Sequence, residues 1–101
     1  MNRVVITGMG IVSSLGTNKT EVLESLKSAK SGIEFSEKYS EMGLRSQVHG
    51  SISEIDTSEV IDRKMLRFMA DAAIFNAIAL DEAIKDSGLS EDMISNERTG
   101  L

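Results

Sequence analysis

The chain has 101 residues, of which 41% are hydrophobic and 27% charged, and its formal net charge is −5. This length allows at most one domain, and the composition is neither that of a disordered chain nor that of a membrane protein. With no cysteine and a single histidine, His49, these residues cannot form a thiolate nucleophile, a disulfide, a zinc–thiolate site or a two-histidine pair. The acidic balance argues against a nucleic-acid-binding face. We expect no catalytic residue, no metal ligand and no nucleic-acid partner here.

The longest uncharged stretch, residues 4–18, contains three glycines and several hydroxyl side chains, so it does not predict a membrane span. A strand-like segment begins almost at once after Met1, which leaves no room for a signal peptide. We therefore expect a cytoplasmic protein without a membrane partner.

The first predicted element is a strand at Val4–Ile6, a continuous run of β-branched residues that is followed by Gly8 and Gly10. Continuity rather than alternation is typical of a strand that is buried on both faces of a parallel sheet. A helix is predicted from Lys19 to about Lys30, with Asn18 as N-cap and Glu21 as its capping-box partner.

The pattern weakens over an excursion at residues 32–60. Ile33 and Phe35 are expected to pack singly, residues 37–43 to form a surface loop, and residues 47–52 to contain a short edge strand.

The strongest helical pattern runs from about 62 to 87, with Gly88 as its stop. Between residues 72 and 80 only Asn76 is polar, so this helix is expected to be buried on several sides. Ser90 is expected to cap a short turn, and residues 98–101 resemble the approach to another strand.

Together these elements predict an α/β fold that the chain cannot complete. A doubly buried strand and an apolar helix need layers that two helices and one hairpin do not supply. We expect residues 1–101 to be the N-terminal part of a larger α/β protein and not a complete domain. The alternative is a small domain completed by oligomerisation.

The glycine-rich turn at residues 8–13 is one candidate binding motif, because dinucleotide sites need glycines where the backbone approaches a pyrophosphate. However, Ser13 stands where a third glycine belongs, and no helix begins directly after the turn. A structural turn is favoured. Met65, Phe68, Met69 and Phe75 lie at helical spacing, for which core packing is favoured over an acyl tunnel.

The second candidate is a basic cluster, Arg63, Lys64 and Arg67, which holds three of the eleven cationic residues within five positions. If Asp62 is the N-cap, these cations lie in a first helical turn, where the macrodipole disfavours positive charge by up to ~1 kcal/mol each. Such a conflict favours a function, with an anionic surface as the natural partner. A solvated face with Asp62 and Asp71 as charge partners is the alternative, and these residues alone leave both open.

Five segments in order now carry a resemblance: RVVITGMGIVSSLG, SLKSAKSGIEFS, EMGLRSQVHG, IDRKMLRFMADAA and AIKDSGLS. Together they resemble the N-terminal segment of the β-ketoacyl-acyl carrier protein synthases, over essentially all 101 residues. The segments GLRSQVHG and IDRKMLRFM favour type I over type II. Met9, where leucine is common in the family, is a conservative departure.

The resemblance implies the N-terminal part of a thiolase-like layered αβαβα fold, and a fatty-acid condensing enzyme that performs decarboxylative Claisen condensation with malonyl-acyl carrier protein. It implies a homodimer and no metal or nucleotide cofactor. The family's catalytic cysteine and two histidines belong to later parts of the longer protein, so no catalytic residue is carried over. The positions that match are those that dock the acidic acyl carrier protein, Arg63, Lys64 and Arg67, with Arg45 as a weaker candidate.

Two other functions remain open beside this one. The first is an NAD(P)-binding dehydrogenase segment that uses the turn at Gly8. The second is a small non-catalytic module that binds anionic proteins through the basic cluster.

Overall fold

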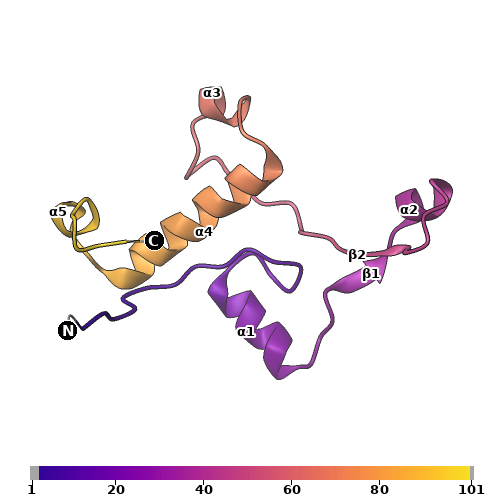
Figure 1. Cartoon of the computed structure of the whole chain (residues 1–101), viewed down its shortest axis with the longest axis horizontal. Helices are drawn as coiled ribbons and strands as arrows, with labels where there is room; N and C mark the ends of the chain where they lie inside the picture. Colours follow the sequence, from indigo (N-terminus) through magenta and orange to yellow (C-terminus); the bar gives the residue numbers. More distant parts are fainter. Residues whose placement is uncertain (1–2, 101) are drawn as a thin grey trace. The chain divides into compact units, whose positions relative to one another are not determined.

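The computed structural model describes residues 3–100, which contain five helices and a two-stranded sheet (Figure 1). The chain forms two compact units, the first made of residues 1–11 and 57–101 and the second of residues 12–56. Helices with a small sheet agree with an α/β content, whereas a layered arrangement is not shown. Within residues 3–100, no helix is both long and apolar enough to cross a bilayer.

In the second unit, α1 (Lys19–Lys27) begins where the sequence predicts. The side chain of Asn18 accepts a hydrogen bond of 3.0 Å from the Glu21 N–H, as an N-cap does. The helix ends three residues before the predicted Lys30. The Ser28 hydroxyl donates to the Glu24 carbonyl at 2.9 Å, and Ala29 adopts a left-handed φ of 55°, which stops the helical path.

A hairpin follows, in which β1 (Ile33–Phe35) pairs with β2 (Val48–Gly50) in antiparallel register, Glu34 opposite His49. The strand predicted within residues 47–52 is therefore present. The prediction that residues 37–43 form a loop was wrong, because α2 (Glu37–Glu41) lies there. Its N-cap is Ser36, whose hydroxyl accepts a hydrogen bond of 3.3 Å from the Tyr39 N–H, and this local cap is sufficient to start one helical turn.

In the first unit, the predicted strand at residues 4–6 does not form. Val4, Val5 and Ile6 belong to no helix or strand and are 91%, 70% and 87% exposed. A strand exists only when its backbone pairs with a neighbour, and the described part of this unit offers no other strand. The approach to a strand expected at residues 98–101 likewise gives only a turn through residue 100, and Leu101 lies outside the described residues.

The predicted helix over 62–87 is divided in two, α3 (Arg63–Leu66) and α4 (Asp71–Ser87). The Phe68 N–H donates to the Met65 carbonyl at 2.9 Å, which closes a tight three-residue turn after α3. Ala70 is then extended, with φ −79° and ψ 159°, so the helical hydrogen bonds cannot continue through it.

The predicted stop of α4 is confirmed, since Gly88 has a left-handed φ of 63°. The predicted turn after Ser90 is also present as α5 (Glu91–Ile94). The expectation that α4 is buried on several sides is not met in this structure, because none of its residues is fully buried. Among the described residues, the only buried hydrophobic side chains are Val22 and Ile61, and neither is fully buried.

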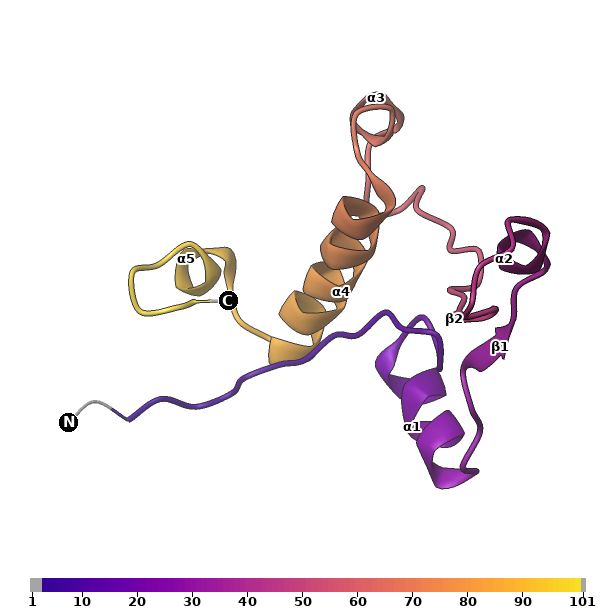
Figure 2. The same ribbon diagram turned by 45° about the vertical axis from the view of Figure 1, so that its right-hand side comes forward.

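Residues 8–11 run along the C-terminal half of α4 (Figure 1, Figure 2). The Met9 N–H donates to the Asp86 carboxylate at 3.1 Å, and the Ile11 N–H donates to the Glu82 carboxylate at 3.0 Å. A Cβ atom added at Gly10 would overlap the backbone of α4, so glycine permits the close approach of the two segments.

Candidate functional site

The basic cluster occupies one short segment of the first unit. Arg63 and Lys64 belong to α3, Arg67 is its C-cap, and all three side chains are exposed. The Asp62 carboxylate accepts a hydrogen bond of 2.8 Å from the Lys64 N–H, which confirms Asp62 as the N-cap. The predicted cap therefore sets the start of α3, the helix that carries the first two cationic side chains.

None of the three cations forms an ion pair with any residue between 3 and 100. Asp62 uses its carboxylate as a helix cap, and Asp71 begins α4 beyond the turn that follows the cluster. The structure therefore gives no support to a face neutralised by these two carboxylates. The positive charge remains available to a partner.

The predicted conflict between these cations and a helix macrodipole is much reduced. That argument assumed a long helix beginning at Asp62, but α3 has only four residues, so few peptide dipoles add along its axis. The exposure of the cations, rather than the position of a helix end, is what makes this segment a candidate docking surface.

Arg45, the weaker candidate, lies in the second unit, between α2 and β2, and its side chain is exposed. Arg45 therefore belongs to a different compact unit from the basic cluster.

The glycine turn lacks the geometry of a nucleotide site. The backbone N–H groups of Met9 and Ile11, which a phosphate would need, donate instead to carboxylates of α4. Those carboxylates belong to Asp86 and Glu82, near the C-terminal end of the helix, where a phosphate would be repelled by both side chains and dipole. The structural turn favoured by the sequence agrees with this arrangement.

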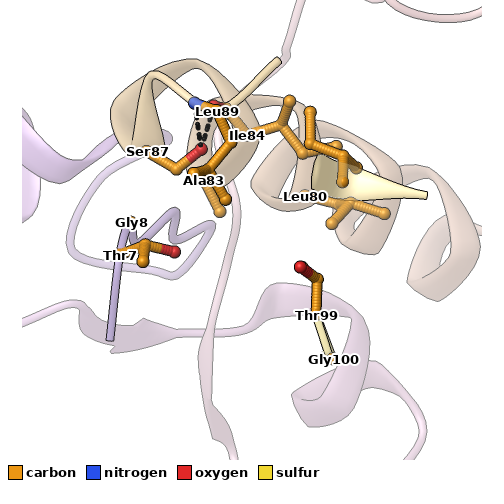
Figure 3. A pocket seen from close by; sticks show the side chains of 10 residues that line it. Thr7, Gly8, Leu80, Ala83, Ile84, Ser87, Leu89, Thr99 and Gly100 are labelled. Atoms are coloured by element: carbon orange, nitrogen blue, oxygen red, sulfur yellow. Dashed lines mark hydrogen bonds between the residues drawn. The ribbon is translucent and has the colours of Figure 1, made fainter. Parts of the chain in front are cut away.

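A cavity of about 290 Å³ lies beside this turn, between α4 and the C-terminal segment (Figure 3). Two of its hydroxyl groups have partners within the unit: Ser87 donates to the Ile84 carbonyl at 2.7 Å, and Thr99 donates to the Met93 carbonyl at 2.5 Å. No titratable side chain lines it, so it holds no acid, base or activated nucleophile. The lining residues are Thr7, Gly8, Leu80, Ala83, Ile84, Ser87, Leu89, Ile94, Thr99 and Gly100.

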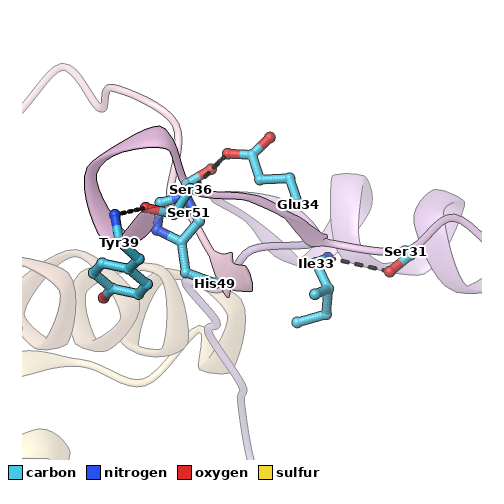
Figure 4. A network of polar contacts seen from close by, with 7 residues as sticks. All are labelled: Ser31, Ile33, Glu34, Ser36, Tyr39, His49 and Ser51. Carbon is cyan, nitrogen blue, oxygen red and sulfur yellow. Dashed lines mark hydrogen bonds and ion pairs between the residues drawn. The ribbon is translucent and has the colours of Figure 1, made fainter. Parts of the chain in front are cut away.

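His49 belongs to a polar network on the hairpin (Figure 4). Its Nε2 lies 3.6 Å from Glu34 Oε1, its ring meets the Tyr39 ring edge-on at 5.5 Å, and the Ser51 hydroxyl donates to the Glu34 carboxylate. The carboxylate therefore stands between hydroxyl and imidazole, whereas nucleophile activation requires these two to bond directly. No group of three or more potential metal ligands occurs within residues 3–100.

One feature of the candidate surface is missed by sequence reasoning. Met65 and Phe68 are expected in the core, yet they are 61% and 90% exposed beside the cluster. The sequence gives no signal of this exposure, since an aromatic residue at helical spacing is more often in a core.

The similarity to known proteins extends over the whole chain. Residues 1–101 match the family model described as "Beta-ketoacyl synthase, N-terminal domain". The chain is 56% identical over 101 residues to 3-oxoacyl-(acyl-carrier-protein) synthase 1 of Haemophilus influenzae, and 49% identical over 102 residues to the protein of that name from Escherichia coli K12. A third similar protein, from Buchnera aphidicola subsp. Baizongia pistaciae, has the same name and is 50% identical over 102 residues.

Each of these alignments covers 100% of this chain but only 25% of the relative. The chain thus spans about a quarter of the length of the curated relatives that it matches.

Proposed function

This chain belongs to the β-ketoacyl synthase family, whose N-terminal domain it matches, and from this premise we propose that it is part of a fatty-acid condensing enzyme. The whole protein would be an acyltransferase that joins an acyl thioester to malonyl carried on acyl carrier protein, with loss of carbon dioxide. The match over all 101 residues, together with relatives named as synthase 1, is the observation that carries this proposal. The same match contradicts the dehydrogenase alternative.

Within that enzyme we assign this chain a scaffold role in a thiolase-like layered fold. The β-branched run Val4–Ile6 has the composition of a central strand but no partner in its unit, and the apolar face of α4 is only half-covered. Further strands and helices of a layered protein would supply both needs. A second subunit of a homodimer would cover further apolar surface.

The chain contributes no catalytic residue under this proposal. It lacks cysteine, and its one histidine is engaged with Glu34 and Tyr39 on the hairpin. The thioester chemistry would belong to the remaining three quarters of the protein.

The second contribution of the chain is docking of an acidic carrier protein through Arg63, Lys64 and Arg67. All three are exposed and free of ion pairs with the described residues, in a chain whose net charge is otherwise negative. A local positive surface of this kind steers an acidic partner and fixes its orientation. Arg45 is a secondary contributor in the same proposal.

The double variant Arg63→Glu/Arg67→Glu tests this docking role in the full-length protein. Reversing two contacts should weaken the affinity for acidic acyl carrier protein roughly tenfold or more and flatten its salt dependence, because fewer favourable charge pairs remain to be screened. Titration calorimetry at low and physiological salt measures both quantities. KM for carrier-bound substrate should rise while kcat stays unchanged.

The matched control is Lys27→Glu/Lys38→Glu, which changes the net charge equally but acts on exposed lysines of α1 and α2. It should leave the affinity nearly unchanged. Equal binding by the wild type and the Arg63/Arg67 variant would contradict the docking role. Normal carrier binding without condensing activity in the wild type would favour the non-catalytic module instead.

A further inference from the structure

The exposed apolar side chains of the cluster segment need an explanation of their own. Phe68 is 90% exposed and Met65 is 61% exposed, so both side chains are largely in contact with water. Neighbouring residues of the same segment are covered: Ile61 is 8% exposed and Leu66 is half-buried. The segment therefore has an anchored side and a solvent-facing side, and the solvent-facing side carries large apolar groups.

The backbone places these groups next to the cations. The helical path of α3 continues through Arg67, whose φ and ψ are −64° and −21°, into the turn closed by the Phe68 N–H and the Met65 carbonyl. Residues four apart on a helical path share a face, so Arg67 lies over Arg63, and the exposed Phe68 follows Arg67 directly in the turn. At 100° per residue, the exposed arc of α3 and its C-cap runs in the order Arg63, Arg67, Lys64, Met65. The basic edge passes directly into the apolar edge.

This order has the anatomy of a protein–protein contact. The centres of such contacts are enriched in aromatic residues and methionine and depleted in charge, while charged groups occupy the rim. Large apolar anchors near the centre carry most of the affinity, whereas rim charges mainly set the association rate and the orientation.

We propose that Met65 and Phe68 form the apolar centre of the docking surface and that Arg63, Lys64 and Arg67 form one side of its rim. The partner that fits is an acidic protein that exposes apolar side chains beside its carboxylates. This inference rests on the proposed carrier-protein docking and adds to it the part of the partner's surface that is recognised. An anionic membrane fits less well, because only three cations face it and the chain's net charge of −5 opposes its approach.

The test compares Phe68→Ala and Met65→Ala with Arg63→Gln in the full-length protein, using acidic acyl carrier protein as the probe. Phe68→Ala should raise Kd about tenfold, with a smaller rise for Met65→Ala, while the slope of affinity against salt stays that of the wild type. Arg63→Gln should lower that slope. Phe68→Leu should recover most of the affinity, because an apolar group remains.

Met93→Ala is the matched control, since Met93 is a 56% exposed apolar side chain of α5 in the same unit. Its affinity should equal that of the wild type. The thermal midpoint of Phe68→Ala should also be unchanged, and a marked fall would overturn the inference by showing that the full-length protein buries Phe68 in its own core.

The outcomes separate this inference from the proposed function. If Arg63→Gln weakens binding and Phe68→Ala does not, the docking role stands and the apolar centre is refuted. If neither variant changes the affinity, both are refuted. Binding of the wild type to phosphatidylglycerol vesicles that is lost in Phe68→Ala, with carrier affinity intact, would show that the surface serves a membrane.

Discussion

Single side chains cap the starts of α1, α2 and α3 and, in one case, lower the pKa of a carboxyl group. The Glu21 carboxylate accepts hydrogen bonds from the Thr17 N–H at 2.8 Å and from the Thr17 hydroxyl at 3.1 Å. Both bonds favour the ionised form, so the pKa of Glu21 lies below its ordinary value of 4.5. The residue predicted to complete a capping box thus stabilises the start of α1 through the residue before the N-cap.

A pH titration of the chain tests this arrangement. Because the folded pKa of Glu21 is lowered, its stabilising contribution is present above the unfolded pKa and is lost as the pH falls through the folded value. Thr17→Val removes the hydroxyl but keeps the stronger backbone N–H donor, so the Glu21 pKa should rise part of the way to 4.5. Carboxyl chemical shifts measured by NMR give the pKa directly. The same pKa in Thr17→Val and wild type would show that the hydroxyl bond contributes nothing.

At the scale of elements, the contact between residues 8–11 and α4 depends on the absence of side chains. A Cβ at Gly10 would lie 2.8 Å from the Ala83 backbone nitrogen and closer still to the Ala79 carbonyl. Gly10→Ala should therefore destabilise the first unit by about 1–3 kcal/mol, as overpacking does where backbone faces backbone. Hydrogen exchange of the Met9 and Ile11 N–H groups should accelerate, since the segment can no longer reach the carboxylates.

Gly100→Ala is the control for that substitution, because nothing lies within 4 Å of a Cβ built there. Its exchange rates at Met9 and Ile11 should match those of the wild type. If Gly10→Ala matched them as well, the close approach of the segment to α4 would be refuted.

The elements also show what the sequence can predict. Caps and stops are local, so Asn18, Asp62 and Gly88 were identified from their own neighbourhoods. The break between α3 and α4 was not identified from the sequence, because residues 67–70 contain neither glycine nor proline and their turn depends on tertiary context. The strand predicted at residues 4–6 does not form either, since a strand needs a second segment to pair with.

The candidate site likewise has one part that the sequence predicts and one part that it does not. Arg63, Lys64 and Arg67 could be singled out from residue type and spacing alone, and the structure confirms that their side chains are exposed. The exposure of Phe68 could not be predicted, since an aromatic residue at helical spacing is more often in a core. Phe68 lies in the turn that follows α3, and its side chain is largely exposed there.

At the scale of the whole molecule, the balance between apolar residues and buried residues is unusual. The chain is 41% hydrophobic, yet among its described residues only two hydrophobic side chains are buried, and fifteen large ones are exposed. A soluble domain of this length normally buries a contiguous core. Apart from Met65 and Phe68, which we assign to the docking surface, we infer that this apolar surface packs against other parts of a longer protein.

The isolated chain should consequently behave as an incomplete unit. We expect it to bind the dye ANS, to associate as its concentration rises, and to lose its helical circular dichroism over a broad temperature range, because uncovered apolar surface favours association over a single packed state. The full-length protein, in which further layers cover Val4–Ile6 and the exposed face of α4, should bind little dye and unfold in a narrow transition. Sedimentation measured alongside the melting curves distinguishes association from folding. A monomeric chain of 101 residues with a sharp cooperative transition would contradict the scaffold role, because it would show that these faces need no covering layer.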